Sequence, residues 1–399
     1  MQRRFIIYAV SASPAGTMGG NTKIAIEIAR NLPVHGWKVV VIVPTSKKAT
    51  FLDNLPAAEG VEYVEIEDFP VSELRHLFGS ARHFSCEVSR TFERLDVGPR
   101  DVVYATCNFH TDILPLRREK RKRRFVYLAT HYLFVPFIVE NLVRHYRFPA
   151  IKYLAAWFYE RMLFSVNRSL ADGFVITNDD DRRHFGAGWQ KRMFAFYGGV
   201  NVEQIPRGAS EKTRDVVFCS RLHPQKGVEG LLDIWRFVRE KNPLLRLTLI
   251  GNGAPDYEAR LRRKVERLGI ADSIDWLGYV NNEAKFRVYS ESRVFVHPTV
   301  FDNNGMVAAE ALCSGLPVVM YDLPALRKVY ADGCVKVPYG DKVRFADEIV
   351  RLASDAAHYA EVAPTAEQVK TLREHWNWPS RVDRFVEFLT GLEGERERT

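Results

Sequence analysis

The chain has 399 residues, of which 46% are hydrophobic and 27% are charged, and its formal net charge is +8. One hydrophobic core seldom covers this length, so we expect two domains of roughly 200 residues each in a soluble globular protein. The positive charge suits anionic partners: nucleotide phosphates, lipid head groups or nucleic acid.

The cysteines and the apolar runs narrow the class of protein further. The five cysteines are scattered without paired spacing, which argues against a disulfide framework and a zinc site and favours a reducing, cytoplasmic compartment. We interpret the N-terminal segment as a first strand rather than a secretion signal, because a glycine-rich turn follows at once. No uncharged apolar run reaches the ~18 residues that span a bilayer.

The first predicted elements are a strand over residues 5–10, a loop over residues 11–20 that contains Gly19 and Gly20, a helix, and a strand over residues 37–43. This order raises a dinucleotide-binding interpretation. It fails because the glycines do not form G-x-G-x-x-G and no acid follows the second strand to hold a ribose. A tight turn without a ligand stays open as an alternative for this loop.

In the rest of the first half, His131 is the candidate residue, because it ends an apolar strand where α/β proteins bind ligands. A lone histidine is more often a surface or satisfied core residue. A later stripe with helical spacing is expected to pack in the core (Ile151, Leu154, Ala155, Phe158, Met162 and Val166). We predict strands near residues 61–66, 101–105, 125–130 and 171–177, and a helix around residues 85–95.

A basic run from Arg117 to Arg124 is interrupted only by Glu119. Most charge runs are solvated loops or helix faces. The alternative is attraction to an anionic membrane, worth about 1 kcal/mol per basic side chain, which would place the protein at the inner face of the membrane. Nucleic-acid binding is not favoured, because aromatic residues are not interleaved with the run as stacking platforms would be.

The second half begins a new α/β pattern after a polar boundary near residues 200–212. A strand over residues 216–219 is followed by Arg221 and Lys226, and a helix over residues 228–238 comes next. Two cations at a strand end would clamp a diphosphate, with Arg221 as a planar fork and Lys226 as a point charge. Two further strands end at the glycine turn of Gly251 and at Val280, and helices are predicted over residues 344–352 and 379–392.

The most informative stretch is a strand over residues 294–296, a polar turn from Asp302 to Gly305, a helix, and a strand over residues 318–320. The free N–H groups at the helix start form a phosphate site. Two acids there, Asp302 and Glu310, suit hydroxyl groups of a sugar and a ribose. The alternative is that Asp302 only caps the helix and Glu310 is solvated.

These segments resemble the family 4 (group 1) retaining glycosyltransferases. Residues 302–310 resemble their acid-x7-acid motif, with Asp-Asn-Asn-Gly where the family usually has Glu-Gly-Phe-Gly. Residues 220–227 resemble G-R-L-x-x-x-K-G, and residues 197–201 resemble an interdomain turn. The resemblance implies an α/β GT-B fold of two Rossmann-like domains facing each other across a cleft. Its expected bounds are 1–203 for the acceptor domain, 204–375 for the donor domain, and 376–399 for a helix that crosses back.

The resemblance also implies roles for individual residues. The expected catalytic residues are His131, Arg221, Lys226 and Asp302. The expected donor-binding residues are Gly19, Gly20, Gly251, Val280, Asn303, Asn304, Gly305, Met306, Val307 and Glu310.

The implied activity is transfer of a hexosyl group from a nucleotide-sugar to a glycan, lipid-linked or small-molecule acceptor, with retention of configuration. We expect no metal, because cationic side chains replace a divalent ion, and no cofactor besides the nucleotide-sugar co-substrate. The alternatives are a sugar-nucleotide epimerase of the same fold and a catalytically weak nucleotide-sugar-binding subunit, which the altered turn at residues 302–304 suggests.

Overall fold

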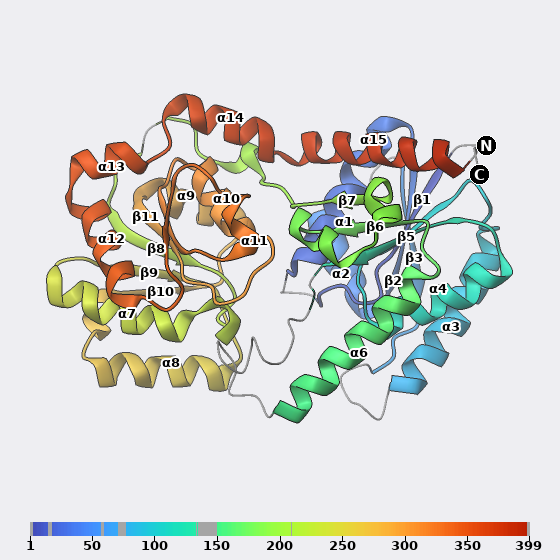
Figure 1. The fold of residues 1–399 in the computed structure, drawn as a ribbon, viewed down its shortest axis with the longest axis horizontal. Helices are drawn as coiled ribbons and strands as arrows, with labels where there is room; N and C mark the ends of the chain where they lie inside the picture. The colour runs from blue at the N-terminus through green and yellow to red at the C-terminus, as the bar shows by residue number, and fades with distance from the viewer. Residues whose placement is uncertain are drawn as a thin grey trace. The chain divides into compact units, whose positions relative to one another are not determined.

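The chain folds into two compact α/β units, each built on a parallel sheet (Figure 1). The computed structural model describes residues 3–14, 18–56, 60–70, 77–132, 134, 150–208 and 210–396. Unit 1 comprises Met1–Gly198 and Arg381–Thr399, and unit 2 comprises Gly199–Ser380. The expected α/β class with two Rossmann-like domains is confirmed.

Unit 1 contains a seven-stranded sheet in the order β3-β2-β1-β4-β5-β6-β7, in which every neighbouring pair is parallel. The chain runs outward from β1 in both directions, so β1 and β4 form the switch point where such sheets bind ligands. The strands are β1 (Arg4–Tyr8), β2 (Lys38–Pro44), β3 (Val61–Ile66), β4 (Val102–Ala105), β5 (Val126–His131), β6 (Gly173–Ile176) and β7 (Met193–Ala195).

The helices of unit 1 are α1 (Gly20–Asn31), α2 (Thr45–Asn54), α3 (Leu77–Arg94), α4 (His110–Lys122), α6 (Ala150–Arg168) and α15 (Trp378–Arg396). The last of these begins three residues before unit 1 resumes at Arg381. It is held by aromatic packing, because the ring of Phe385 lies 5.9 Å from Phe5 in β1 and 5.4 Å from Phe194 in β7. The helix expected around residues 85–95 is found as α3, which starts earlier than the sequence indicated.

The basic run Arg117–Arg124 lies on the second half of α4 and just beyond it. Two basic residues of the run form ion pairs with a buried acid of unit 1. Glu119 is fully buried and receives Lys122 and Arg123, each at 3.0 Å. Three other members of the run are exposed: Arg118, Arg121 and Arg124.

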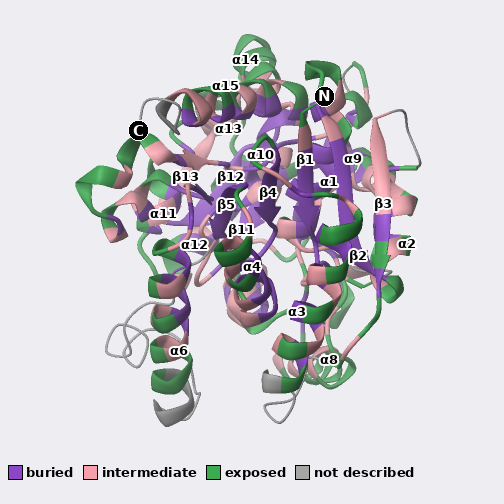
Figure 2. Ribbon diagram, turned by 90° about the vertical axis from the view of Figure 1, so that its right-hand side faces the viewer, coloured by how far each residue is buried: buried purple, intermediate pink, exposed green. Residues whose placement is uncertain are grey.

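The expectation that the apolar stripe of α6 packs in the core is wrong for three of its members, and the side chain of Ile151 lies outside the described part of the structure. Leu154, Phe158 and Met162 are 45%, 66% and 48% exposed, and Figure 2 shows exposed turns along α6. The buried face of this helix is instead formed by Glu160, Leu163, Phe164 and Asn167. Two of these four are polar and are held by partners on β5, so an apolar pattern could not identify this face as the inner one.

Unit 2 contains a six-stranded parallel sheet in the order β10-β9-β8-β11-β12-β13. Its strands are β8 (Arg214–Cys219), β9 (Leu247–Ile250), β10 (Ile274–Gly278), β11 (Ser292–His297), β12 (Val318–Tyr321) and β13 (Cys334–Val337). Its helices are α7 (Val228–Lys241), α8 (Pro255–Leu268), α9 (Asn282–Glu291), α10 (Met306–Cys313), α11 (Pro324–Arg327), α12 (Lys342–Ser354), α13 (Ala356–Val362) and α14 (Ala366–Trp376).

The parallel arrangement decides where the polar residues of unit 2 lie. Because β8, β9, β10 and β11 are neighbours and run in one direction, the loops after them gather at one edge of the sheet. Strands β8, β9, β11 and β12 are mostly buried, so the polar side chains that can reach a ligand lie in the loops after the strands. Within the described ranges, no helix is long and apolar enough to cross a membrane.

Candidate functional site

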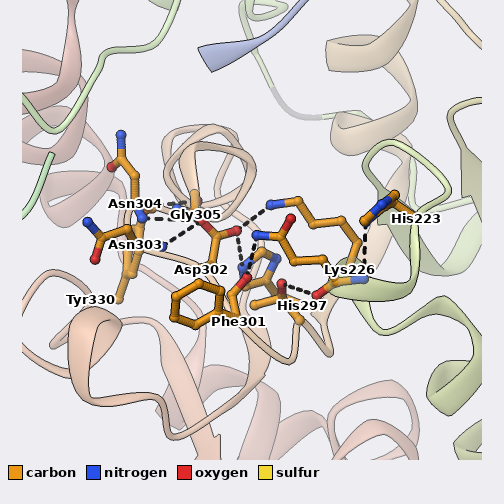
Figure 3. Close-up of polar contacts among 11 residues, drawn as sticks. His223, Lys226, His297, Phe301, Asp302, Asn303, Asn304, Gly305 and Tyr330 are labelled. Atoms are coloured by element: carbon orange, nitrogen blue, oxygen red, sulfur yellow. Dashed lines mark hydrogen bonds and ion pairs between the residues drawn. The ribbon is translucent and has the colours of Figure 1, made fainter. Parts of the chain in front are cut away.

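The turn that opens α10 is organised by Asp302. Its Oδ1 accepts hydrogen bonds from the backbone N–H groups of Asn303 at 2.9 Å, Asn304 at 3.2 Å and Gly305 at 3.2 Å, as Figure 3 shows. The backbone of Gly305 has φ +61°, a conformation that favours glycine. Asp302 therefore holds the turn before α10 but does not cap the helix, whose N-cap is Gly305 and carries no side-chain capping hydrogen bond.

The other carboxylate oxygen of Asp302 pairs with Lys226. The Lys226 Nζ donates to Asp302 Oδ2 at 2.5 Å, and His297 Nε2 lies 3.8 Å from the same oxygen (Figure 3). Burial alone would raise the pKa of Asp302, but Lys226, His297 and the turn N–H groups outweigh it and hold that pKa well below its usual range. Burial lowers the pKa of His297 to about 4, so this imidazole is neutral at pH 7.

Tyr330 holds the turn in place through its hydroxyl group. Its hydroxyl contacts the carbonyl oxygens of Asn304 at 2.8 Å and Gly305 at 2.9 Å, and the phenol is buried. The buried Asn304 carries a side-chain oxygen without a partner among the described residues. These contacts preorganise the start of α10, so its remaining donors keep a fixed direction.

Among the described residues at this sheet edge, one guanidinium group and two backbone N–H groups are available to a ligand. Arg221 follows β8, is exposed, and makes no ion pair within the described part of the chain. The backbone N–H groups of Met306 and Val307, in the first turn of α10, likewise have no acceptor among the described residues. A guanidinium and two N–H groups at a helix start suit an anion such as phosphate.

Glu310 lies one turn further along α10, and only one of its two carboxylate oxygens has a hydrogen-bond partner among the described residues. Lys285 on α9 donates to Glu310 Oε1 at 2.6 Å. The other oxygen, Oε2, is buried and lacks a hydrogen-bond partner in the described structure. A buried carboxylate oxygen without a donor is costly, so this oxygen is suited to accept a hydrogen bond from a ligand hydroxyl.

The two remaining donor-site candidates of unit 2 follow neighbouring strands. Gly251 comes after β9 with φ +129°, and a Cβ there would lie 1.9 Å from the carbonyl oxygen of Ser220, so only glycine allows the loops after β8 and β9 to approach. Its N–H donates to the carbonyl of Gly278 at 2.7 Å. Val280 follows β10 and is half-buried. The sheet therefore brings the unit 2 candidates to one edge.

The candidates of unit 1 lie at the carboxyl ends of its own strands. Gly19 precedes α1 as its N-cap and Gly20 is the exposed first residue of that helix. His131 ends β5 and is fully buried, with Nε2 2.8 Å from Glu160 Oε1 and its ring centroid 3.9 Å from that of Phe134. Burial lowers the pKa of His131, and the neighbouring Glu160 opposes that shift.

Sequence reasoning missed several residues that support these groups. Lys285 stands 25 positions before Glu310, and Tyr330 acts on the turn from a similar separation in the opposite direction. Glu160 is on α6, whereas its partner His131 ends β5. None of these contacts has a local spacing signal. The buried position of a charged residue on α6 is visible only once the helix is placed on the sheet.

Comparison with known proteins relates part of unit 2 to a family of glycosyltransferases. Residues 213–355 match the family model described as Glycosyl transferases group 1. A phosphatidyl-myo-inositol mannosyltransferase of Mycobacterium leprae is 33% identical over 189 residues, which are 45% of this chain and 49% of that protein. In that match the chain spans about half the length of the relative. A D-inositol 3-phosphate glycosyltransferase of Thermomonospora curvata is 23% identical over 97% of this chain and 95% of its own.

Solved structures show that the whole chain has the fold of these glycosyltransferases. A sucrose-phosphate synthase of Thermosynechococcus elongatus superposes with a TM-score of 0.79 at 17% identity, covering 99% of this chain and all of that one. Anabaena HepE in complex with UDP and glucose gives a TM-score of 0.73 at 16% identity, covering 98% and 100%. The expected GT-B fold is confirmed. The match to group 1 glycosyltransferases lies within unit 2 and includes Arg221, Lys226 and Asp302.

Proposed function

We propose that the protein is a retaining, metal-independent glycosyltransferase of family 4 that uses a nucleotide-sugar donor. The observation that carries this proposal is the composition of one sheet edge in unit 2. There an unpaired Arg221 and the N–H groups of Met306 and Val307 suit a diphosphate, and the unpartnered Oε2 of Glu310 suits a hydroxyl. A nucleoside diphosphate sugar carries both kinds of group.

The proposed donor pose assigns one acid to each end of the diphosphate. Glu310 accepts a hydrogen bond from a ribose hydroxyl through its free oxygen, and Asp302 accepts one from a hydroxyl of the transferred sugar. Lys226 does not have to leave Asp302 for this, because an ammonium group has three donors and can reach a phosphate oxygen as well. The HepE structure, which holds UDP and glucose, supports a donor of this class.

The proposed chemistry stabilises the leaving diphosphate. As the bond between the sugar and the phosphate breaks, negative charge grows on the phosphate oxygens, and Arg221, Lys226 and the start of α10 act on that charge. The acceptor hydroxyl attacks from the face that the phosphate leaves and passes its proton to that phosphate. The anomeric configuration is thereby retained without a protein nucleophile. In this account the cationic side chains supply the charge stabilisation that a divalent ion supplies elsewhere.

The acceptor is proposed to bind unit 1 at the carboxyl ends of its strands, while Gly19 and Gly20 stay proposed contacts of the donor diphosphate and His131 of the transferred sugar. A glycan, a lipid-linked sugar or a small polyol fits this role. Two relatives are named for inositol acceptors, so myo-inositol phosphates and phosphatidylinositol belong among the compounds to be tested.

The test begins with thermal stabilisation by UDP-, GDP- and ADP-sugars, since a ligand at 100 times its dissociation constant adds about 2.7 kcal/mol. The stabilising donor is then incubated with acceptors, and the product anomer is read by NMR. The proposal predicts transfer with the donor's configuration kept. An inverted product contradicts retention. Interconversion of the donor sugar without acceptor indicates an epimerase, and binding without turnover indicates a nucleotide-sugar-binding subunit.

A further inference from the structure

One face of α6 is apolar and open to solvent. Leu154, Phe158 and Met162 recur every four residues and are 45%, 66% and 48% exposed. Residues four apart lie above one another on a helix, so these three side chains form a continuous stripe. The opposite face of α6 already packs on β5, so the exposed stripe does not contribute to the core of unit 1. Left in water, it would be an exposed apolar patch of the kind that usually binds a partner. The stripe therefore needs a partner.

The surroundings of this stripe carry positive charge and no exposed acid on the helix itself. Among the described residues of α6, the only acid is Glu160, which is buried. The guanidinium of Arg161 lies 5.1 Å from the centre of the Phe134 ring and 5.7 Å from that of Trp157. Arg168 is exposed at the end of the helix, beside the ring of Phe164. Aromatic rings and arginines beside an apolar stripe are typical of helices that lie in a membrane interface.

The helix that packs against α6 adds further basic side chains. Helix α4 contacts α6 and carries the exposed Arg118 and Arg121, while its Lys122 is held by Glu119 and Ser89. Counting Lys and Arg against Asp and Glu along the sequence places nearly all of the net charge of +8 in unit 1. Each basic side chain near an anionic bilayer adds attraction, which reinforces apolar insertion.

We propose that the exposed face of α6, the stripe of Leu154, Phe158 and Met162, docks onto an anionic lipid bilayer. The three side chains enter the boundary between head groups and acyl chains, and the arginines of α6 and α4 pair with lipid phosphates. A second copy of the chain is disfavoured as the occupant. A twofold dimer through this face would press two copies of the same positively charged surface, with Arg161 and Arg168, against each other. This inference does not depend on the proposed transferase chemistry.

The test is co-sedimentation of the full chain with vesicles of phosphatidylcholine alone and with vesicles that also contain phosphatidylglycerol. We expect binding to the anionic vesicles that weakens with salt. The triple variant Leu154→Ser, Phe158→Ser, Met162→Ser should bind at least tenfold more weakly. The matched controls are Val34→Ser and Leu244→Ser, which remove apolar residues that are 86% and 85% exposed elsewhere, and these should bind like the parent chain. Thermal melts check that all variants stay folded.

Two further measurements decide between occupants. In a Phe158→Trp variant, fluorescence should be quenched by lipids brominated on their acyl chains, because the side chain at that position enters the bilayer. Sedimentation analysis of the parent chain and the triple variant should give the same oligomeric state. Unchanged vesicle binding by the triple variant overturns the proposal. So does a dimer of the parent chain that the triple variant dissociates, since the stripe would then bind a second copy.

Discussion

Lys226 and Asp302, which stand 76 positions apart in sequence, form a 2.5 Å ion pair at the start of α10. The same carboxylate receives three backbone N–H groups of its own turn, so one side chain joins the loop after β8 to the loop after β11. The positive charge of Lys226 is thereby offset in the free protein. Arg221, which makes no ion pair in the described part of the chain, is left as the uncompensated cation of this edge.

Replacement of Arg221 should therefore reduce turnover more than it changes folding. We expect Arg221→Ala to raise the activation barrier by about 3–4 kcal/mol, or roughly 10²–10³ in kcat, if it acts like other oxyanion donors. Steady-state kinetics with the preferred donor measure this. Arg236→Ala, an exposed arginine on α7, is the control and should leave kcat unchanged. Near-native turnover of Arg221→Ala would remove Arg221 from the mechanism.

Glu310 should matter for donor affinity. Its buried Oε2 lacks a donor in the described structure, and Glu310→Gln replaces a charged acceptor by a neutral amide that can no longer receive the ribose hydroxyl as well. We expect donor binding to weaken by about 1.5–3 kcal/mol, or roughly tenfold to a hundredfold, in calorimetric titration. Glu367→Gln on the exposed side of α14 is the matched control. Equal affinities for the parent chain and Glu310→Gln would show that this oxygen does not contact the donor.

Gly227 should be indispensable to the stability of unit 2. It has φ +72°, and a Cβ would lie 1.9 Å from the carbonyl oxygen of Pro298, a backbone atom that cannot move aside easily. Gly227→Ala should lower the free energy of unfolding by about 3 kcal/mol or more. Gly230, three residues on in α7, has open space around a Cβ, so Gly230→Ala should raise it by about 0.5–1 kcal/mol. Denaturant titration measures both, and an equal effect of the two substitutions would contradict the assigned backbone approach.

The stability of unit 2 should fall in mild acid because of His297. Burial lowers its pKa in the folded chain to about 4, against about 6.5 in the unfolded chain. The unfolded state then binds more protons between these values, so stability decreases as the pH falls from 7 toward 4, by about 3 kcal/mol. The pKa of Asp302 lies below this window, so Asp302 stays ionised.

The measurement is urea unfolding at pH 7 and pH 4 for the parent chain and for His297→Gln, which cannot take up this proton. Other buried histidines with lowered pKa values, such as His131, contribute to both proteins and cancel in the difference. The parent chain should lose about 3 kcal/mol more than the variant over this range. Equal losses would mean that His297 is protonated without cost in the folded state.

Much of the sheet could be predicted because its strands are buried on both faces. Residues 125–130 and 318–320 stand out as apolar segments with clear ends, and the structure places β5 and β12 there. The phosphate edge could also be predicted, since glycine turns and cations after strands are local signals. Short edge strands such as β7 and β13 carry too few residues to produce a pattern.

What could not be predicted depends on contacts between distant segments. The sequence places Asp302 in a turn but does not show that Lys226 will occupy its second oxygen. It shows an apolar stripe on α6 but not that the core selects the face with Glu160 and Asn167, because their partners, His131 and Tyr127, come from another element. Pattern reasoning assigns apolar residues to the interior, and it fails where buried polar pairs orient a helix.

The account depends on a diphosphate bound at the start of α10. The most direct measurement is a crystal structure of the full chain with the nucleoside diphosphate that stabilises it most in thermal melts. The account predicts the diphosphate oxygens within hydrogen-bonding distance of the Arg221 guanidinium and of the Met306 and Val307 N–H groups, with a ribose hydroxyl on Glu310 Oε2. A nucleotide bound elsewhere, with Arg221 and Glu310 left without contact to it, would contradict the account.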